Sequence, residues 1–323
     1  MLTADKVKQI AREAGADIVA IGPVSRLEGA PKQYDARYML PSAKSIIAFG
    51  FRHARGCFRG IEEGTFFSAY NTMGYASINY IYQPYVLCQV ARAIEDEGYD
   101  ALPLPNNFPW NAVNVGGQGT LEESQKANPG MSRPPAPGKP APNVFIQLRI
   151  ACFAAGLGEI GFSKMFLSKQ FGPRQRLAAI LTDAEFDYDE QYEPGTVCDK
   201  CMACVHACTG NAIPTDRMIK IRVGDRDVEW ADIDMKKCST FFCGGAPEKN
   251  PFCTTEEDRE KFGATVGVAQ AHKCKPVYMY SRALEGAAGC IRACMIHLEE
   301  QGKIASQFEN RFRKKKQWTM ETP

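Results

Sequence analysis

The 323-residue chain lacks several features that would place it in common functional classes. Its amino terminus has no basic segment followed by an apolar one, no twin arginine and no window long enough to span a bilayer. We therefore expect a cytoplasmic protein without a membrane partner. The net charge of +2 gives no polyelectrolyte signal, so no nucleic-acid partner is expected. Only four histidines occur, and none forms a recognisable pair with an acid or a nucleophile, which argues against histidine-driven hydrolysis.

Cysteine, in contrast, is abundant, with thirteen residues. In a cytosolic chain of this length, such a count favours metal ligation over disulfides and indicates a reducing, oxygen-poor setting. Four of them form the run Cys198-Asp-Lys-Cys201-Met-Ala-Cys204-Val-His-Ala-Cys208. This C-x2-C-x2-C-x3-C spacing is typical of 4Fe-4S binding, whereas zinc usually takes two separated C-x2-C pairs. The run predicts an iron-sulfur protein that transfers single electrons.

A second cysteine motif is expected downstream, because the fourth cysteine of such a run binds the other cluster in two-cluster ferredoxins. The pair Cys290 and Cys294, spaced as C-x3-C, lies in the expected place. By this logic Cys208 and Cys290 belong to the second cluster. The first cluster is then held by Cys198, Cys201, Cys204 and Cys294.

Hydrophobic periodicity predicts alternating helices and strands, with an apolar run at 45–51 that is typical of a strand buried on both faces. Residues 105–142 break this pattern, because they are rich in glycine, proline and asparagine, and form a long loop. The expected elements are helix 3–15, strand 17–21, strand 45–51, helix 86–98, strand 100–104, helix 144–155, strand 177–181, a hairpin over 219–230 and a final helix over 304–312.

Aromatic residues crowd the stretch 66–85, which contains Tyr70, Tyr75 and Tyr80. For any single tyrosine, ordinary core packing is the simpler explanation, because aromatic side chains mainly bury area. The alternative is the wall of a pocket that carries one acidic phenol.

The order of several motifs carries a family resemblance. The chain contains Ala155-Gly-Leu-Gly-Glu-Ile-Gly161, Phe171-Gly-Pro-Arg-Gln-Arg-Leu177 and Leu181-Thr-Asp183, followed by the cysteine run and Asn211-Ala-Ile213. From about Tyr70 onward, this succession resembles the cobalamin-dependent reductive dehalogenases and, in part, the related epoxyqueuosine reductases. The chain has Thr209 and Met295 where the family usually has proline, and Ala287 where a cluster ligand is usual.

This resemblance implies an α/β (α+β) fold class with two parts. Residues 1–187, including the long loop 105–142, would form a nitroreductase-like core that binds cobalamin and substrate. Residues 188–323 would form a ferredoxin-like domain with two 4Fe-4S clusters. The sequence has no D-x-H-x-x-G segment, so the cobalamin would bind without a protein histidine on the cobalt.

The resemblance also suggests the remaining ligands. Cys238 lies where the family places a lone upstream cysteine, and is the expected third ligand of the second cluster. Cys243, Cys253 and Cys274 compete for the fourth, and we favour Cys274 because it is nearest in sequence to Cys290. Cofactor-binding residues are expected in the family-like segments, at Gly156, Leu157, Gly158, Phe171 and Gly172.

The favoured function is an oxidoreductase that cleaves a carbon-halogen or similar carbon-heteroatom bond in a small-molecule substrate. Tyr70, Tyr75 or Tyr80 would protonate the product, and Lys164 or Arg174 would hold the leaving anion or lower the tyrosine pKa. Those two cations could equally be surface charges or partners of a cofactor carboxamide or phosphate. Reduced ferredoxin or flavodoxin is the expected electron donor, and a homodimer is allowed for.

Two other functions remain as alternatives. Epoxyqueuosine reduction in tRNA would need an aspartate general acid upstream of Ala155, but no carboxylate occurs between Ser124 and Arg149. An electron-transfer protein without a substrate of its own would need only a small ferredoxin module. The long apolar α/β portion argues against it.

Overall fold

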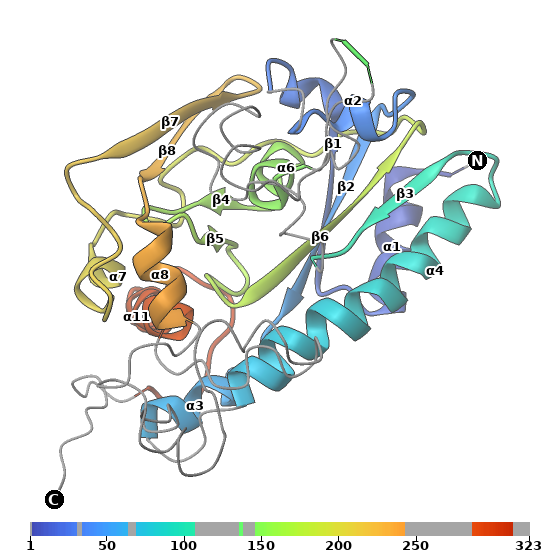
Figure 1. The fold of residues 1–323 in the computed structure, drawn as a ribbon. Helices are drawn as coiled ribbons and strands as arrows, with labels where there is room; N and C mark the ends of the chain where they lie inside the picture. Colours follow the sequence, from blue (N-terminus) through green and yellow to red (C-terminus); the bar gives the residue numbers. More distant parts are fainter. Residues whose placement is uncertain are drawn as a thin grey trace, which may run out of the picture.

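The structure is a computed structural model, and it describes residues 2–30, 34–63, 69–106, 136–137, 146–242 and 286–312. These residues form a mixed α/β fold around one central sheet (Figure 1). The Cys238 side chain is included, whereas Cys243, Cys253, Cys274 and Ala287 have no described side chain. The long loop predicted at 105–142 also lies almost entirely outside the described residues.

The helices and strands follow one another along the whole described chain. They are α1 (Ala4–Ala14), β1 (Ile18–Pro23), the 3-10 helix η1 (Val24–Leu27), α2 (Ala36–Met39), β2 (Ser45–Arg52), α3 (Gly56–Glu63), the π-helices η3 (Tyr70–Ala76) and η4 (Ile78–Tyr82), α4 (Gln83–Glu95), β3 (Ala101–Leu104), α6 (Leu148–Ala154), β4 (Glu159–Ile160), β5 (Phe166–Leu167), β6 (Gln175–Thr182), α7 (Ala203–His206), β7 (Met218–Val223), β8 (Arg226–Ala231), α8 (Met235–Phe242) and α11 (Gly286–Glu300).

The central sheet has the strand order β1-β2-β6-β3, and each neighbouring pair is antiparallel. Both faces of β2 and β6 are covered. Ile47 and Phe49 pack with α1 and α4 on one face, while Ile46 and Ala48 pack with α6 on the other (Figure 1). This double burial explains why β2 reads as a continuous apolar run.

The helix α1 shows how local sequence sets the ends of an element. The Thr3 hydroxyl accepts a hydrogen bond from the Lys6 N–H at 3.2 Å, which satisfies one of the unpaired donors at the helix start. Gly15 ends the helix at φ 120°, a backbone conformation that side chains disfavour. The predicted helix 3–15 is therefore confirmed.

Two π-helices lead directly into α4. The Ser77 N–H bonds to the Thr72 carbonyl and the Gln83 N–H to the Ile78 carbonyl, each five residues back. Such wide turns are rare and occur mostly at functional sites. Because the repeat is i→i+5, residues spaced by five lie near each other along the helix.

The remaining predictions can be compared with these elements. The strands 17–21, 45–51, 100–104 and 177–181, the helices 86–98 and 144–155 and the hairpin 219–230 are confirmed within a few residues. No helix in the described part of the chain is both long and apolar enough to cross a bilayer.

The predicted final helix over 304–312 is wrong. Residues 303–312 have no regular helix, because their backbone bonds elsewhere: the Ala305 N–H donates to the Lys169 carbonyl at 2.8 Å and the Ser306 N–H to the Gln170 carbonyl at 3.1 Å. The rings of Phe308 and Phe312 lie 4.3 and 4.5 Å from the guanidinium carbon of Arg55. Packing against arginine, not helical periodicity, accounts for the spacing of these aromatic residues.

Candidate metal centre and active site

The first cysteine group contains four thiols from two separate segments. Cys198, Cys201 and Cys204 come from the loop before α7 and from α7 itself, and Cys294 comes from α11, which packs on α7. All four line one small hollow. Burial and then the charges of Cys198, Cys204 and Cys201 raise the pKa of the Cys294 thiol. The structure thus brings together the four residues predicted to hold the first cluster.

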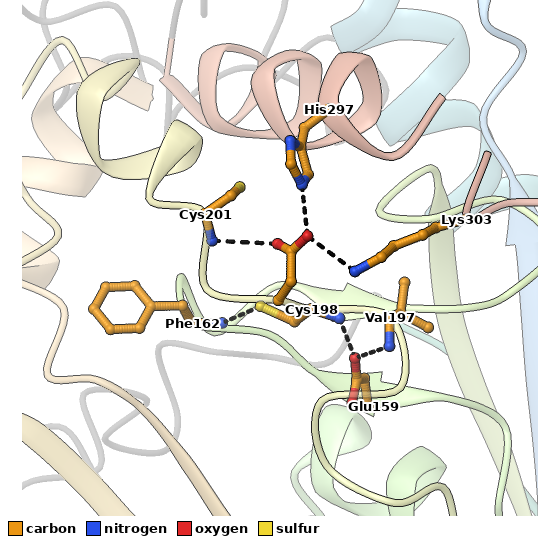
Figure 2. Close-up of polar contacts among 8 residues, drawn as sticks. Glu159, Phe162, Val197, Cys198, Cys201, His297 and Lys303 are labelled. Atoms are coloured by element: carbon orange, nitrogen blue, oxygen red, sulfur yellow. Dashed lines mark hydrogen bonds and ion pairs between the residues drawn. The ribbon is translucent and has the colours of Figure 1, made fainter. Parts of the chain in front are cut away.

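The loop between these cysteines turns tightly. Lys200 and Met202 adopt left-handed backbone conformations, with φ of 56° and 63°. The Asp199 carboxylate accepts the Cys201 N–H at 3.2 Å and is bound from the α11 side by His297 Nε2 at 2.8 Å and Lys303 Nζ at 2.9 Å (Figure 2). Although partial burial opposes them, these two bonds hold the pKa of Asp199 below its usual range.

The core contacts the same loop from the other side through the segment 159–163. The Glu159 carboxylate accepts the N–H groups of Val197 at 2.6 Å and of Cys198 (Figure 2). It also accepts the N–H group of Gly195 at 2.8 Å. The Phe162 N–H lies 3.4 Å from Cys198 Sγ, and the Ser163 side chain bonds to Cys204. Hydrogen bonds to ligand sulfurs are one means by which proteins adjust iron-sulfur clusters.

The second cysteine group contains Cys208, Cys238 and Cys290, where α8 and α11 pack together. The Ala212 N–H lies 3.3 Å from Cys208 Sγ. Burial, followed by the charges of Cys238, Cys204 and Cys208, raises the pKa of Cys290. Three predicted ligands therefore lie together, and the predicted fourth, Cys274, lies outside the described residues together with its competitors Cys243 and Cys253.

The spacing of the thiols bears on the choice between iron-sulfur and zinc. A tetrahedral zinc with Zn–S bonds of 2.3 Å needs sulfurs about 3.8 Å apart. Among the residues that the structure describes, no three cysteine sulfurs lie within 4.8 Å of one another. The grouping found at that distance is Asp199, Cys201 and His297, whose polar atoms already bond to each other and to Lys303. The described thiols are thus not spaced as the ligands of one tetrahedral zinc ion.

The predicted tyrosines lie on the π-helical segment, spaced by five residues. Tyr70 is buried, its ring stacks on His53 with centroids 5.5 Å apart, and its hydroxyl has no hydrogen-bond partner among the described residues. Burial raises the pKa of Tyr70 and of Tyr80, and the nearby Arg176 opposes this in both. Tyr75 acts electrostatically on both of the other two, so the three phenols form one group.

Two arginines that were missed in the sequence join this tyrosine group. Arg176 on β6 lies over the Tyr75 ring, 4.2 Å from its centroid, and its Nε donates to Asn79 on η4 at 2.9 Å. Burial and then the charge of Arg176 lower the pKa of Arg149, which also senses Tyr75, Cys238 and Cys290. These arginines place positive charge between the tyrosines and the second cysteine group.

Lys164 and Arg174, the two predicted cations, have different surroundings. Burial lowers the pKa of Lys164 to about 8, with Arg149 adding to the effect and Asp232 opposing it. Lys164 therefore lies at the edge of the arginine group. Arg174 is 2% exposed, donates to the His53 carbonyl at 2.8 Å and packs near the rings of Phe171 and Phe308. The arginine that contacts a tyrosine is Arg176.

The five residues predicted to bind a cofactor all pack against protein. A side chain at Gly156 (φ +84°) would meet the Glu190 carbonyl, and one at Gly158 would meet the Leu167 carbonyl. Leu157 belongs to the core beside α6, as does Phe171, and Gly172 (φ +56°) lies against Leu298. In the described part of the chain, these five residues do not line a space in which a corrin could bind. A role in cofactor binding stays a prediction.

Comparisons with known proteins show what the chain is similar to. No known family's sequence profile matches it. Over 107 residues it is 32% identical to tetrachloroethene reductive dehalogenases of Desulfitobacterium hafniense and Dehalobacter restrictus, a match that covers 30% of this chain and 19% of each relative. A solved catabolic reductive dehalogenase aligns with 99% of this chain and 41% of its own, with a TM-score of 0.51 and 16% identity.

The chain is similar to the reductive dehalogenases in a stretch of its sequence and in its fold. The match spans only about a fifth of the length of these curated relatives. An epoxyqueuosine reductase from Streptococcus thermophilus aligns with 94% of this dehalogenase-like chain and 83% of its own, with 13% identity and a TM-score of 0.47.

Proposed function

We propose that this dehalogenase-like chain is a reductase that cleaves a carbon-halogen or similar carbon-heteroatom bond in a small molecule. The observation that carries the proposal is the position of the second cysteine group. Cys290 and Cys238 act electrostatically on Arg149, and Cys290 acts on Tyr70. Electron-transfer ligands thus adjoin phenols and cations, the groups that a reductive bond cleavage requires.

Two iron-sulfur clusters fit the cysteines that the structure brings together. Cys198, Cys201, Cys204 and Cys294 would hold the first, and Cys208, Cys238 and Cys290, with Cys274 as the proposed fourth ligand, would hold the second. When bound, such clusters supply single electrons at low potential. Cys201 is exposed at the surface, whereas Cys290 lies beside the tyrosine group, so electrons would enter from reduced ferredoxin or flavodoxin at the first site.

Cobalamin belongs to the proposal through the relatives. One solved neighbour, with a TM-score of 0.51, is described as showing a mechanism for B12-dependent dehalogenation. A corrin would supply a reduced cobalt centre for the bond cleavage. We assign no described residue to hold it, because the five residues expected to do so are packed against protein.

The tyrosine side chains would supply the proton, and the cationic side chains would stabilise the negative charges that form. Tyr75 is the proposed acid, and its phenol would deliver a proton to the carbon that loses the leaving group. Arg176, whose guanidinium carbon lies 4.2 Å from the centroid of the Tyr75 ring, would stabilise the resulting phenolate. Burial raises the pKa of Tyr70, so that phenol keeps its proton at neutral pH. Lys164 and Arg149 would hold the departing anion.

Anaerobic purification with cobalamin supplied tests this function. We expect about eight irons, eight sulfides and one cobalt per chain, and halide release from a panel of halogenated aromatic and aliphatic compounds with dithionite-reduced methyl viologen as donor. Zinc in place of iron, or iron without cobalt and without bond cleavage, would contradict the proposal. The second of these results would favour the electron-transfer protein.

A separate variant tests which cysteine is the fourth ligand of the second cluster. Replacing Cys274 with serine should leave about four irons per chain. An unchanged iron count would transfer the assignment to Cys243 or Cys253, which the same measurement on their serine variants would separate.

A further inference from the structure

Glu159 on β4 is a buried carboxylate, and no cation in the described part of the chain forms an ion pair with it. It is 2% exposed, and its three hydrogen bonds all come from backbone N–H groups of the segment 195–198. None of the ion pairs found in the described parts of the chain includes it. Since every partner is a donor, the arrangement suits the ionised carboxylate, which is an acceptor only.

The carboxylate lies against the first cysteine group. One of its oxygens accepts the Cys198 N–H, and the next residues of the same segment contact two ligand sulfurs, through the Phe162 N–H to Cys198 and the Ser163 side chain to Cys204. Gly161 belongs to this contact as well, because a Cβ there would lie 3.4 Å from Cys198 Sγ. The core thus brings one full negative charge to the edge of the proposed first cluster.

Asp199, on the opposite side of the loop, shows why Glu159 differs. Its carboxylate is partly exposed, contacts His297 Nε2 and is paired with the Lys303 ammonium. Water and counter-charges screen such a group, whereas a buried unpaired charge acts over a longer distance in a medium of lower dielectric constant. Asp199 acts on the Cys201 thiol but has the Lys303 cation paired with it, whereas no cation among the described residues pairs with Glu159.

We propose that Glu159 is a positioning residue that fixes the Cys198 backbone and lowers the reduction potential of the cluster held by Cys198, Cys201, Cys204 and Cys294. Reduction adds one electron to the cluster, and a fixed negative charge nearby disfavours that added charge. The inference rests on the iron-sulfur part of the proposed function. Glu159, the acidic residue of the Ala155–Gly161 motif, would thereby have a role in electron transfer at the first cluster.

The test is redox potentiometry of the holoprotein, monitored by electron paramagnetic resonance with dithionite as the reductant. Glu159→Gln keeps the side-chain length and an oxygen acceptor but removes the charge. We expect the midpoint potential of one cluster to shift upward, the other to stay in place and the iron content to stay at the wild-type value. Because potentiometry reads whichever clusters assemble, partial loading does not prevent the measurement.

Glu229→Gln is the matched control. Glu229 also contacts this loop, through Lys200, but it is partly exposed and is paired with Lys220 as well. Removing its charge should leave both potentials unchanged. An equal upward shift in this control would overturn the proposal, because a screened surface charge would then act as strongly as Glu159.

The outcomes separate this inference from the function on which it rests. Wild-type protein without iron-sulfur signals would defeat the proposed function itself. Wild-type signals with two unshifted potentials in Glu159→Gln would defeat only the role of Glu159. If the glutamine variant assembles no first cluster, the Glu159→Asp variant is measured next. An aspartate variant that assembles this cluster with a potential near the wild-type value supports a role for the negative charge. An aspartate variant that also lacks the cluster shows that only the shape of the side chain matters.

Discussion

The two cysteine groups take ligands from neighbouring turns of α11, yet they lie in different surroundings. Cys294 faces a hollow that reaches the surface at Cys201, and the loop around it is bound by carboxylates from both sides. Cys290 has tyrosines and arginines around it. The first group thus has one buried carboxylate, Glu159, beside it, whereas the second has arginine side chains nearby.

This contrast indicates a direction for electrons. Negative charge near a cluster lowers its reduction potential, and positive charge raises it. An electron that arrives at the first group would therefore move toward the second, where the proton donors lie. Four measurements test this difference between the two cysteine groups.

Removing one ligand from each group should separate the two sites completely. Cys294→Ala is expected to lose the first cluster and Cys290→Ala the second, so each keeps about four irons. Cys88→Ala changes an exposed cysteine on α4 and should keep about eight. Iron and sulfide quantification checks all three, and a single substitution that removes every iron would mean that the groups form one site.

Removing the positive charge beside Tyr75 should impair catalysis without changing the metal content. Arg176→Gln takes away a guanidinium 4.2 Å from the Tyr75 ring, and we expect kcat/KM to fall by about 100- to 1000-fold. Arg92→Gln, on the exposed side of α4, is the control and should have little effect. Turnover within a few-fold of wild type in Arg176→Gln would remove this residue from the active site.

Two of the contacts that anchor α11 should differ in their effect on stability. Glu62 and Arg292 form a buried ion pair at 2.8 Å near Cys290, and Glu62→Gln should lower the free energy of unfolding by about 3 to 5 kcal/mol. The partly exposed Asp199 contacts near Cys294 are weaker, so Asp199→Asn should cost about 1 kcal/mol. Urea unfolding at equal metal loading measures both, and a larger loss in Asp199→Asn would reverse the comparison.

The smallest effect concerns pH. Since burial lowers the pKa of Lys164 to about 8, its ammonium is present at pH 7 and is lost as the pH rises through 8. If this charge holds the leaving anion, kcat/KM should decline above about pH 8. Lys164→Arg keeps the charge and should extend the plateau to higher pH, whereas an identical decline in this variant would assign the titration to another group.

Much of the grouping of the cysteines could be predicted from sequence, because cluster ligation depends on spacing. The intervals between Cys198, Cys201, Cys204 and Cys208 indicate a cluster-binding loop, and the exchange of one ligand between the halves predicts that Cys294 joins the first three. The structure brings both groups together accordingly. The fold class could also be predicted, because the doubly buried strands and amphipathic helices have clear periodicity.

The cations beside the tyrosine group could not be predicted in the same way. Tyr70, Tyr75 and Tyr80 are visibly spaced by five, but this spacing has meaning only on a π-helix, which ordinary helical periodicity does not suggest. Arg176 comes from a strand almost one hundred residues later, and only the packing of η4 on β6 brings it to Tyr75. Arg174, two residues away, carries no sequence signal that distinguishes it from Arg176.

Tertiary contacts also decided two other points that local sequence left open. The aromatic spacing of 304–312 suggested a helix, but arginine side chains and the 169–170 backbone use these residues instead. Glu159 was visible only as part of a family-like motif. Its bonds to 195–198 join segments more than thirty residues apart.

The segment that leads to the cysteine loop is fastened to the core just after residue 187. Asp189 binds Lys8 Nζ and the Ile21 N–H at 2.7 Å each through its carboxylate, and its carbonyl accepts from Arg26 at 2.9 Å. Among the described residues, these bonds hold the chain to the core at Asp189, just before the cysteine loop. Tunnelling rates fall steeply with distance, so a fastened loop would keep the electron path at constant length through each catalytic cycle.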